Sequence, residues 1–263
     1  LARWYCLTVH HLARIEAARA GETRDVASIT RGISRRLTKL SKIATASSNA
    51  GPMVGSAIIH EKATGWWCTG YGATFAGLPW RLPPEINYLS ARHAWLAADI
   101  GIALETRGYR VVTQRELGSG ITVTSHRLDG WNFKSPFTTP GGQTVTKDPD
   151  VAVLGDRGRF IAIEVERQSS RPLRTYLEKL TAYRDNTDVA AVWYVCATPA
   201  IANRVGAAAN RVFSDGRGGF INYPLRVRVA NPASPDVITD LDTHDGLQAD
   251  LVGLGTPQLG AHP

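Results

Sequence analysis

The chain contains little cysteine, and its cysteines are scattered. The three are Cys6, Cys68 and Cys196, and no two of them form a CxxC pair. An odd number at such wide spacing argues against a disulfide framework and against a structural zinc site, whose ligands come in clusters. A reducing cytoplasm fits this use of cysteine best.

Long apolar runs are also missing. No stretch reaches the roughly 18 apolar residues that a membrane-spanning helix needs. No secretory signal peptide is recognisable, although the chain starts at Leu1 without a methionine, so its true start can lie upstream. We therefore predict a cytoplasmic protein that makes no contact with a membrane.

Three common catalytic signatures are absent from the sequence. There is no GxSxG nucleophile motif, no GxxxxGK[ST] phosphate-binding loop and no HExxH zinc motif. A hydrolase of one of these unrelated kinds therefore has little support.

Acidic residues are in the minority. Thirty Lys and Arg face 23 Asp and Glu, which gives a net charge of +7 and a pI near 9.5. This balance is compatible with a polyanionic partner but does not identify one. The length of 263 residues allows one large or two small domains, and 43% hydrophobic with 20% charged residues is typical of a soluble globular protein.

The chain opens with a short predicted helix. Thr8 is a good N-cap residue, and apolar residues follow it at helical spacing. His10 and His11 lie among them. Adjacent helical residues point about 100° apart and cannot grip one metal together, so we interpret both histidines as surface residues.

A second helix is predicted from Arg24 to Lys42, with apolar residues at steps of three and four. Its other faces carry a single acid, Asp25. A charged helical face is usually just solvated, which is the alternative to a DNA-binding face. The candidate DNA-binding residues are Arg24, Arg31, Arg35, Arg36, Lys39 and Lys42.

The order of elements favours the DNA-binding interpretation. The basic helix is followed by a Gly- and Ser-rich link and by two candidate strands, around 58–60 and 66–69. Helix, helix, hairpin is the order of a winged helix-turn-helix, whose second helix enters the major groove. We expect Trp66 and Trp67 to pack in the wing or the core. Prolines 83 and 84 mark a domain boundary near residue 85, which makes residues 1–85 the first domain.

The second predicted domain, 86–230, mixes helices and strands in an α/β fold of the α+β kind. It begins with a helix that is apolar on most sides, in which His93 and Asp99 are expected to be hydrogen-bonded core residues. Residues 231–263 are predicted to form a weakly ordered tail. The elements expected before the tail are a helix at 89–106, a strand at 109–116, an irregular loop at 118–147, a helix at 172–185, a buried strand at 189–197, a helix at 199–213 and a strand at 225–229.

Residues 147–166, KDPDVAVLGDRGRFIAIEVE, predict a β-hairpin at the centre of this domain. If Leu154 pairs with Phe160, Asp150 lies directly opposite Glu164, and Glu166 shares the face of Glu164. Opposed like charges cost about 0.2 to 1 kcal/mol in a strand pair. A bound Mg²⁺ or Mn²⁺ would reverse that effect. The alternative is that this strand face is simply solvated.

The hairpin resembles the PD-(D/E)xK motif of the restriction-endonuclease-like nucleases. Pro149 and Asp150 match its first part and Glu164 its second, with Glu166 where the lysine usually stands. The resemblance implies an αβββαβ core and a divalent metal, Mg²⁺ or Mn²⁺. It further implies that Asp150, Glu164 and the backbone carbonyl of Val165 are metal ligands, and that Glu166 helps to hold or polarise the attacking water.

A wider set of segments resembles the replication-relaxation family, bacterial proteins of plasmids and mobile elements that join a winged helix to a nuclease-like domain. The segments are RGISRRLTKL, WWCTGYGATFAGLP, ARHAWLAADIGIALETRGYRVVTQREL and the acidic hairpin, and the similarity covers roughly residues 1–200. The family often has a lysine shortly after the second glutamate. The corresponding stretch RQSSRP, residues 167–172, has none, so Gln168 or Lys179 would have to substitute.

Two functions follow from these expectations. The first is a divalent-metal-dependent DNA endonuclease or nickase acting in replication, mobilisation or DNA processing, with Lys179 as the cation near the leaving oxygen. The second is a non-catalytic DNA-binding regulator or replication accessory that keeps the nuclease fold as a scaffold. Both imply double-stranded DNA as the partner, and a homodimer is compatible with either.

Overall fold

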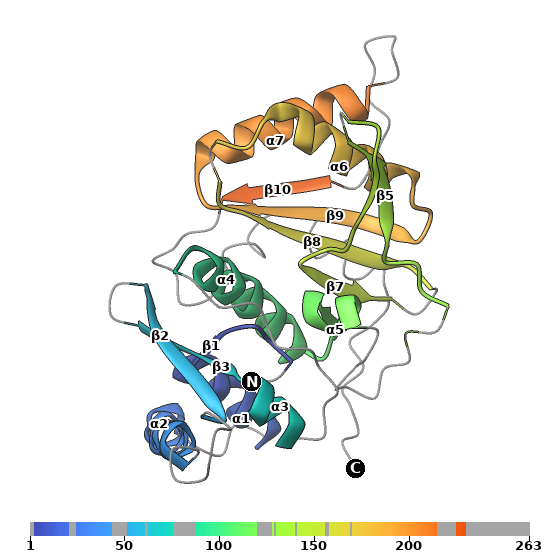
Figure 1. Cartoon of the computed structure of the whole chain (residues 1–263). Coiled ribbons are helices and arrows are strands. Elements are labelled where there is room, and N and C mark those ends of the chain that lie inside the picture. Colours follow the sequence, from blue (N-terminus) through green and yellow to red (C-terminus); the bar gives the residue numbers. More distant parts are fainter. Residues whose placement is uncertain are drawn as a thin grey trace. The chain divides into compact units, whose positions relative to one another are not determined.

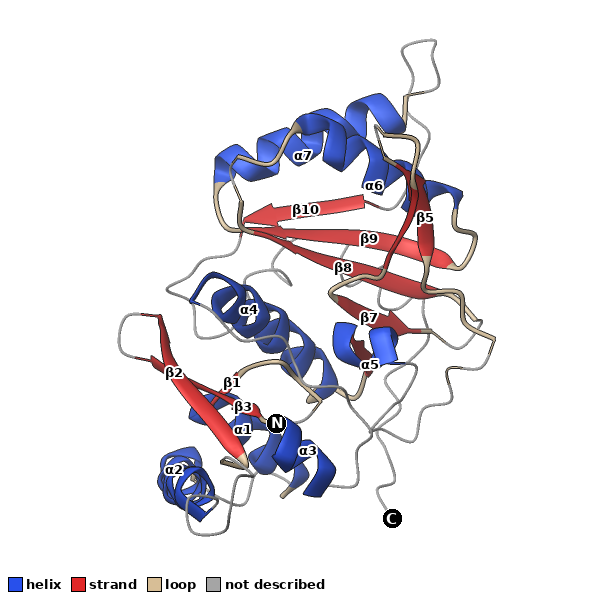
Figure 2. Ribbon diagram, viewed as in Figure 1, coloured by secondary structure: helices blue, strands red, loops and turns tan. Residues whose placement is uncertain are grey.

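The computed structural model contains seven helices and three sheets among the residues it describes (Figures 1 and 2). The described residues are 3–20, 25–43, 52–60, 63–75, 88–119, 128, 130–139, 141–155, 158–168, 170–214 and 225–229. The chain divides into two compact units, Leu1–Thr106 and Arg107–Pro263. The boundary predicted near residue 85 and the predicted tail at 231–263 lie outside the described residues.

The first unit combines four helices with a three-stranded antiparallel sheet of order β1-β3-β2. The basic helix predicted from Arg24 to Lys42 is α2, and the two predicted strands are β2 and β3, both somewhat longer than expected. In chain order the elements are β1 (Leu7–Thr8), α1 (Val9–Arg19), α2 (Val26–Ile43), β2 (Val54–His60), β3 (Ala63–Cys68), α3 (Gly70–Phe75) and α4 (Tyr88–Glu105).

Helix α1 begins where the sequence predicts, but one of its histidines is not a surface residue. Thr8 is the N-cap: its hydroxyl accepts from the His11 N–H at 3.3 Å, and the His11 ring Nδ1 accepts from the Thr8 N–H at 3.3 Å. This reciprocal cap turns the His11 ring inward, and the side chain is only 1% exposed. The surface interpretation of His11 is therefore wrong, whereas His10 is exposed.

Helix α2 is held by its apolar stripe. Ile29, Ile33 and Leu37 are buried and share a core with Val54 of β2 and Trp66 of β3. Trp66 is thus a core residue, as predicted. The faces of α2 away from this stripe are left to charged residues.

Helix α4 packs against α1, β1 and β2 of the first unit, whereas the sequence analysis assigned it to the second domain. Asp99 on α4 is buried and hydrogen-bonded, as predicted: it accepts from Arg14 Nη1 at 2.8 Å and lies 3.3 Å from His11 Nε2. Gly101 lets α4 approach Trp4 closely, because a Cβ at this position would lie 2.1 Å from the indole ring. The apolar sequence of α4 predicts that the helix is buried, but it does not predict which elements the helix packs against.

The second unit is built on a five-stranded sheet of order β10-β9-β8-β7-β4. Strand β7 pairs antiparallel with both β4 and β8, whereas β9 pairs parallel with both β8 and β10. In chain order the elements are β4 (Arg110–Thr113), α5 (Gln114–Ser119), β5 (Ser135–Thr138), β6 (Thr144–Lys147), β7 (Val151–Leu154), β8 (Phe160–Glu166), α6 (Leu173–Asp185), β9 (Val189–Cys196), α7 (Pro199–Val212) and β10 (Leu225–Val229).

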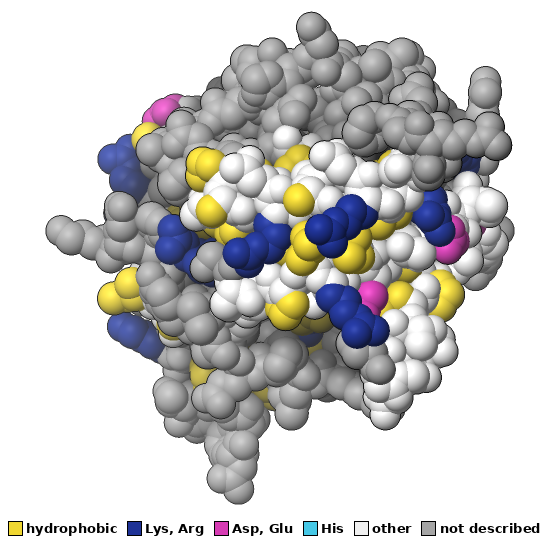
Figure 3. Space-filling model, turned by 90° about the horizontal axis from the view of Figure 1, so that it is seen from above, with side chains coloured by type: hydrophobic (Ala, Val, Ile, Leu, Met, Phe, Trp, Pro, Cys, Tyr) yellow, Lys and Arg dark blue, Asp and Glu magenta, His cyan; other side chains and the backbone are white. Residues whose placement is uncertain are grey.

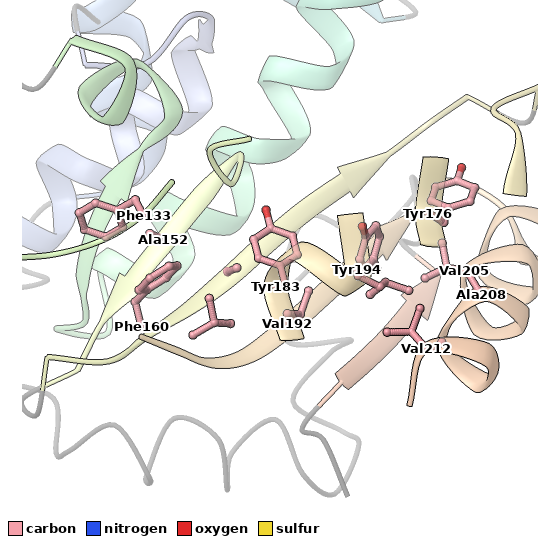
Figure 4. Close-up of a cluster of buried hydrophobic side chains, with 14 of the residues drawn as sticks. Phe133, Ala152, Phe160, Tyr176, Tyr183, Val192, Tyr194, Val205, Ala208 and Val212 are labelled. Carbon is pink, nitrogen blue, oxygen red and sulfur yellow. The ribbon is translucent and has the colours of Figure 1, made fainter. Parts of the chain in front are cut away.

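Helices α6 and α7 are the crossovers between the parallel strands, and they pack side by side on one face of the sheet (Figure 2). Their inner faces and the strands form the main core of the unit (Figure 4). The buried residues of this core include Phe160, Ala162, Tyr176, Leu180, Tyr183, Val192, Tyr194, Ile201, Val205, Ala208 and Val212.

Most of the predicted elements of this unit are present within a residue or two, but two predictions are wrong. The strand expected at 109–116 ends at Thr113, and α5 follows. The Thr113 N–H donates to Glu116 Oε2 at 2.9 Å and the Glu116 N–H to the Thr113 hydroxyl at 3.3 Å, which starts a helix. The loop expected at 118–147 contains the antiparallel pair β5–β6, of which β5 packs against α6.

None of the helices that the structure describes is both long enough and apolar enough to cross a membrane.

Candidate functional site

The β7–β8 hairpin has the register that the sequence analysis assumed. Leu154 pairs with Phe160, and Val151 pairs with Ile163 at the other end of β7. Asp150 is one residue before Val151 and Glu164 one residue after Ile163, so the register brings the two acids opposite each other. The hairpin therefore sets two carboxylates of the candidate site side by side.

All three predicted acids are buried. Asp150 is 5% exposed, Glu164 1% and Glu166 3%. The alternative of a simply solvated strand face is therefore wrong. Because an isolated buried carboxylate is very costly, each of the three needs compensating partners.

Glu164 has partners on both carboxylate oxygens. Lys179 Nζ of α6 lies 2.8 Å from its Oε2, and the Tyr183 hydroxyl donates to its Oε1. Lys179 is itself only 6% exposed. The structure thus brings the predicted Lys179 to the site, as a direct ion-pair partner of Glu164.

Asp150 is held by the neighbouring strand and by a lysine. Its Oδ2 accepts from the Val165 N–H at 2.8 Å, and Lys147 Nζ lies 3.9 Å from its Oδ1. Burial acts to lower the pKa of Lys147, but Glu164 and Asp150 outweigh burial and the pKa of Lys147 is raised. Lys147 therefore stays protonated beside Asp150.

Glu166 is held by the segment that follows β8. Its Oε1 accepts from the backbone N–H groups of Arg167 and Gln168, both at 2.9 Å, and its Oε2 lies 3.1 Å from Arg171 Nη1. The side chain of Gln168 is exposed and accepts from Arg171 at 3.4 Å. Gln168 thus contributes its backbone N–H rather than its side-chain amide, and Arg171 is a cation beside Glu166.

Three buried tyrosines, Tyr176, Tyr183 and Tyr194, were not among the site residues predicted from the sequence; Figure 4 shows them in the core of this unit. Tyr194 pairs with Glu164 across the β8–β9 ladder, and Tyr176 lies edge-on to Tyr194 at 6.4 Å between ring centroids. Burial first, and then the charge of Glu164, raise the pKa values of Tyr183 and Tyr194 well above the ordinary range. Burial and Glu166 raise the pKa of Tyr176 to about 12.

Two of these tyrosine hydroxyls have no hydrogen-bond partner among the described residues. They belong to Tyr176 and Tyr194, both fully buried. A buried hydroxyl without a partner is costly, and it is an open position for a polar ligand at the site. A signal was present in the sequence, because a tyrosine in an otherwise apolar buried strand brings a polar group into the core.

The three carboxylates and three cations, Lys147, Lys179 and Arg171, make a site of balanced charge. In the part of the chain that the structure describes, no group of three His, Cys, Asp or Glu side chains is placed to hold a metal ion. Mg²⁺ needs fewer protein ligands than that, since one or two carboxylates suffice together with water and substrate phosphates. The opposed pair Asp150 and Glu164 fits such a site, with the backbone of Val165 next to both.

The second candidate surface is the outer side of α2. The five described basic residues of the predicted set are all exposed, and Arg24 lies outside the described residues. Asp25 accepts from the N–H groups of Ala27 at 3.1 Å and Ser28 at 3.2 Å, so this acid stabilises the start of α2. The exposed residues are Arg31, Arg35, Arg36, Lys39 and Lys42. Of these, Arg36 lies 3.8 Å from Glu16.

Comparisons with protein-family models, with curated proteins and with solved structures gave no match.

Proposed function

We propose that the chain is a DNA-binding protein of the replication-relaxation kind, with a winged helix-turn-helix in the first unit and a metal-dependent, restriction-endonuclease-like nuclease in the second. The observation that carries the proposal is the buried cluster of Asp150, Glu164, Glu166 and Lys179 on and beside the β7–β8 hairpin. Buried ionisable clusters of this kind are costly for stability and concentrate at functional sites.

The winged-helix part of the proposal is supported by order and topology. Elements β1, α1, α2, β2 and β3 follow one another, and the strands form an antiparallel sheet of order β1-β3-β2. Helix α2 is the second of two consecutive helices and carries the exposed basic residues. In a helix-turn-helix this helix enters the major groove, and its Lys and Arg contact phosphates.

The nuclease part is supported by the sheet of the second unit. Strands β4, β7 and β8 form an antiparallel meander, and α6 crosses over to the parallel strand β9. This resembles the βββαβ part of the αβββαβ order expected from the motif, with α5, β5 and β6 inserted between β4 and β7, and α4 precedes it in the sequence. The acids lie on β8 and just before β7, at the positions that match the motif.

In this proposal Asp150, Glu164 and the carbonyl of Val165 would hold the metal, and Glu166 would help to hold or polarise the attacking water. A bound Mg²⁺ or Mn²⁺ supplies charge neutralisation of the phosphate and a more acidic water. Lys179, which pairs with Glu164, is the candidate for the cation near the leaving oxygen. The buried hydroxyls of Tyr176 and Tyr194, which have no partner among the described residues, are available to bind water at the site.

The test is incubation of the purified protein with supercoiled plasmid and Mg²⁺ or Mn²⁺. We expect nicking that stops with EDTA and is lost in Asp150→Ala and Glu164→Gln. An Asp188→Asn variant, which removes an acid just before β9 and keeps an oxygen that can accept from the Asn132 N–H, is the matched control and should cleave normally. Absence of nicking, or equal nicking by Asp150→Ala, would refute the nuclease.

A second candidate is a non-catalytic DNA-binding regulator or replication accessory. It is favoured by the fact that each carboxylate already has its own cation within the chain, and by Glu166 in place of the usual lysine. DNA binding that ignores EDTA and falls steeply with salt, without any cleavage, would favour this candidate. In both candidates binding should collapse in Arg35→Ala/Arg36→Ala, and unchanged binding there would refute the role of α2.

A further inference from the structure

The outer side of the helical layer of the second unit is basic. Figure 3 shows the molecule from the side on which α6 and α7 lie in Figure 1, and Lys and Arg side chains form a row across this face. Five arginines, four on these two helices and one just before α6, define what we call the α6–α7 surface. Its members are Arg171, Arg174, Arg184, Arg204 and Arg211.

The acids on these helices are few and already paired. On α6, Glu178 Oε1 lies 2.9 Å from Arg174 Nε, and Asp185 Oδ1 lies 2.8 Å from Arg184 Nε. Helix α7 has no acidic residue at all. The α6–α7 surface therefore has an excess of positive charge, concentrated on α7.

Helix α7 repeats the same four residues, ANRV, at 202–205 and 209–212. The valines of both copies are buried against the sheet, and the asparagines are exposed. Seven residues make almost two full helical turns and rise about 10.5 Å, so Arg204 and Arg211 lie on the same side of α7. Between them Gly206 has only a hydrogen and Ala207 only a methyl group as side chain. A Cβ added at Gly206 would have no atom within 4 Å.

The arginines are also held in place by backbone contacts between the elements. Arg204 Nη1 donates to the Arg171 carbonyl at 3.1 Å, and Arg184 Nη1 donates to the Val212 carbonyl at 3.2 Å. These contacts lower the entropy cost of ordering the guanidinium groups when a ligand binds.

We propose that the α6–α7 surface binds the sugar-phosphate backbone of duplex DNA, as a second contact surface separate from α2. The guanidinium fork matches phosphate oxygens in a bidentate manner, and exposed asparagine amides also donate to phosphates. The small residues between the two ANRV copies let a duplex approach the helix closely. The inference shares with the proposed function only the ligand, DNA, and it requires no catalysis.

The test is fluorescence anisotropy of a labelled short duplex with the full chain over a range of salt. In Arg174→Gln/Arg211→Gln we expect binding about tenfold weaker and a salt slope smaller by about 2, because each phosphate contact releases close to one counterion. Lys134→Gln/Arg159→Gln removes the same charge from exposed residues of this unit outside α6 and α7 and should bind like the wild type. Asp185→Asn should bind more tightly than the wild type.

The outcomes separate this inference from the proposed function. If Arg35→Ala/Arg36→Ala retains binding and Arg174→Gln/Arg211→Gln loses it, the role of α2 fails and the α6–α7 surface stands. If Arg174→Gln/Arg211→Gln binds as the wild type or as its charge-matched control, the inference is overturned. It is also overturned if the wild type does not bind duplex DNA, or if poly-glutamate displaces the duplex as well as unlabelled DNA does, which would assign the surface to an acidic protein.

Discussion

The substitution Lys179→Met tests whether the centre of the candidate site is a buried ion pair. Met has nearly the length of Lys but no charge, so the change leaves Glu164 with an uncompensated carboxylate. Both side chains are almost inaccessible, at 7% for Lys179 and 2% for Glu164. Removing one partner of a buried pair typically costs about 3 to 5 kcal/mol. Because the Tyr183 hydroxyl still donates to Glu164, we expect the lower end, about 3 kcal/mol.

A double variant separates the lost ion pair from lost packing. In Lys179→Met/Glu164→Gln no buried charge is left alone, so we expect this variant to recover at least about 1 kcal/mol relative to Lys179→Met. The control is Arg174→Met on the same helix. It breaks the pair with Glu178, in which Arg174 is 63% exposed, and should cost less than about 1 kcal/mol.

The assay is native-state hydrogen exchange of the full chain, read by mass spectrometry on peptides of β8 and α6. It reports the opening free energy of this part of the second unit without requiring that the whole chain unfold in one step. A loss in Lys179→Met no larger than in Arg174→Met would refute the buried ion pair, and so would a double variant that is less stable than Lys179→Met.

Three further predictions concern stability and reactivity. The pKa values of Tyr183 and Tyr194 are raised in the folded state, so the folded protein keeps protons that the unfolded chain releases above about pH 10. The free energy of unfolding should therefore be unchanged below that pH and fall as the pH rises further. Urea denaturation between neutral and alkaline pH measures this, and a Tyr183→Phe/Tyr194→Phe variant that shows the same fall would contradict it. Burial raises the pKa values of Cys6 and Cys196 to about 12, so alkylation near pH 8 should label both thiols only after unfolding, and rapid labelling of either in the native protein would contradict this. In the first unit, Gly101→Ala should destabilise the fold by about 1 to 3 kcal/mol, because the added Cβ would lie 2.1 Å from the Trp4 ring. Gly32→Ala on α2, where an added Cβ would have no atom within 4 Å, should stabilise the fold by up to about 1 kcal/mol. Equal effects of the two substitutions on thermal unfolding would show that Trp4 does not pack against Gly101.

Local features of this fold could be predicted from the sequence. Periodicity and capping residues are short-range signals, so Thr8 predicts the start of α1, and α6, α7, β9 and β10 lie where the apolar patterns predict them. The hairpin register is equally local, because a two-residue period and a short loop allow only one pairing that buries the same faces. The opposition of Asp150 and Glu164 follows from it.

Errors arose where a local pattern has two solutions. The strand predicted at 109–116 extends an apolar run by three residues too many, because the reciprocal bonds between Thr113 and Glu116 start α5 instead. The sequence does not define which side of α1 is exposed at His11. In the structure the His11 ring is buried, where its Nδ1 accepts from the Thr8 N–H and its Nε2 lies 3.3 Å from Asp99. A histidine is stable in either environment, so the sequence alone could not decide.

The sequence by itself therefore determined most of the longer elements, among them the acidic hairpin and the basic helix. Only the tertiary structure decided that Asp150, Glu164 and Glu166 are buried, and that Lys147, Lys179 and Arg171 neutralise them. The tyrosines beside them also come from α6 and β9. Register depends on residues within one hairpin, whereas burial and charge compensation depend on which distant elements pack over it, and no short-range pattern records that choice.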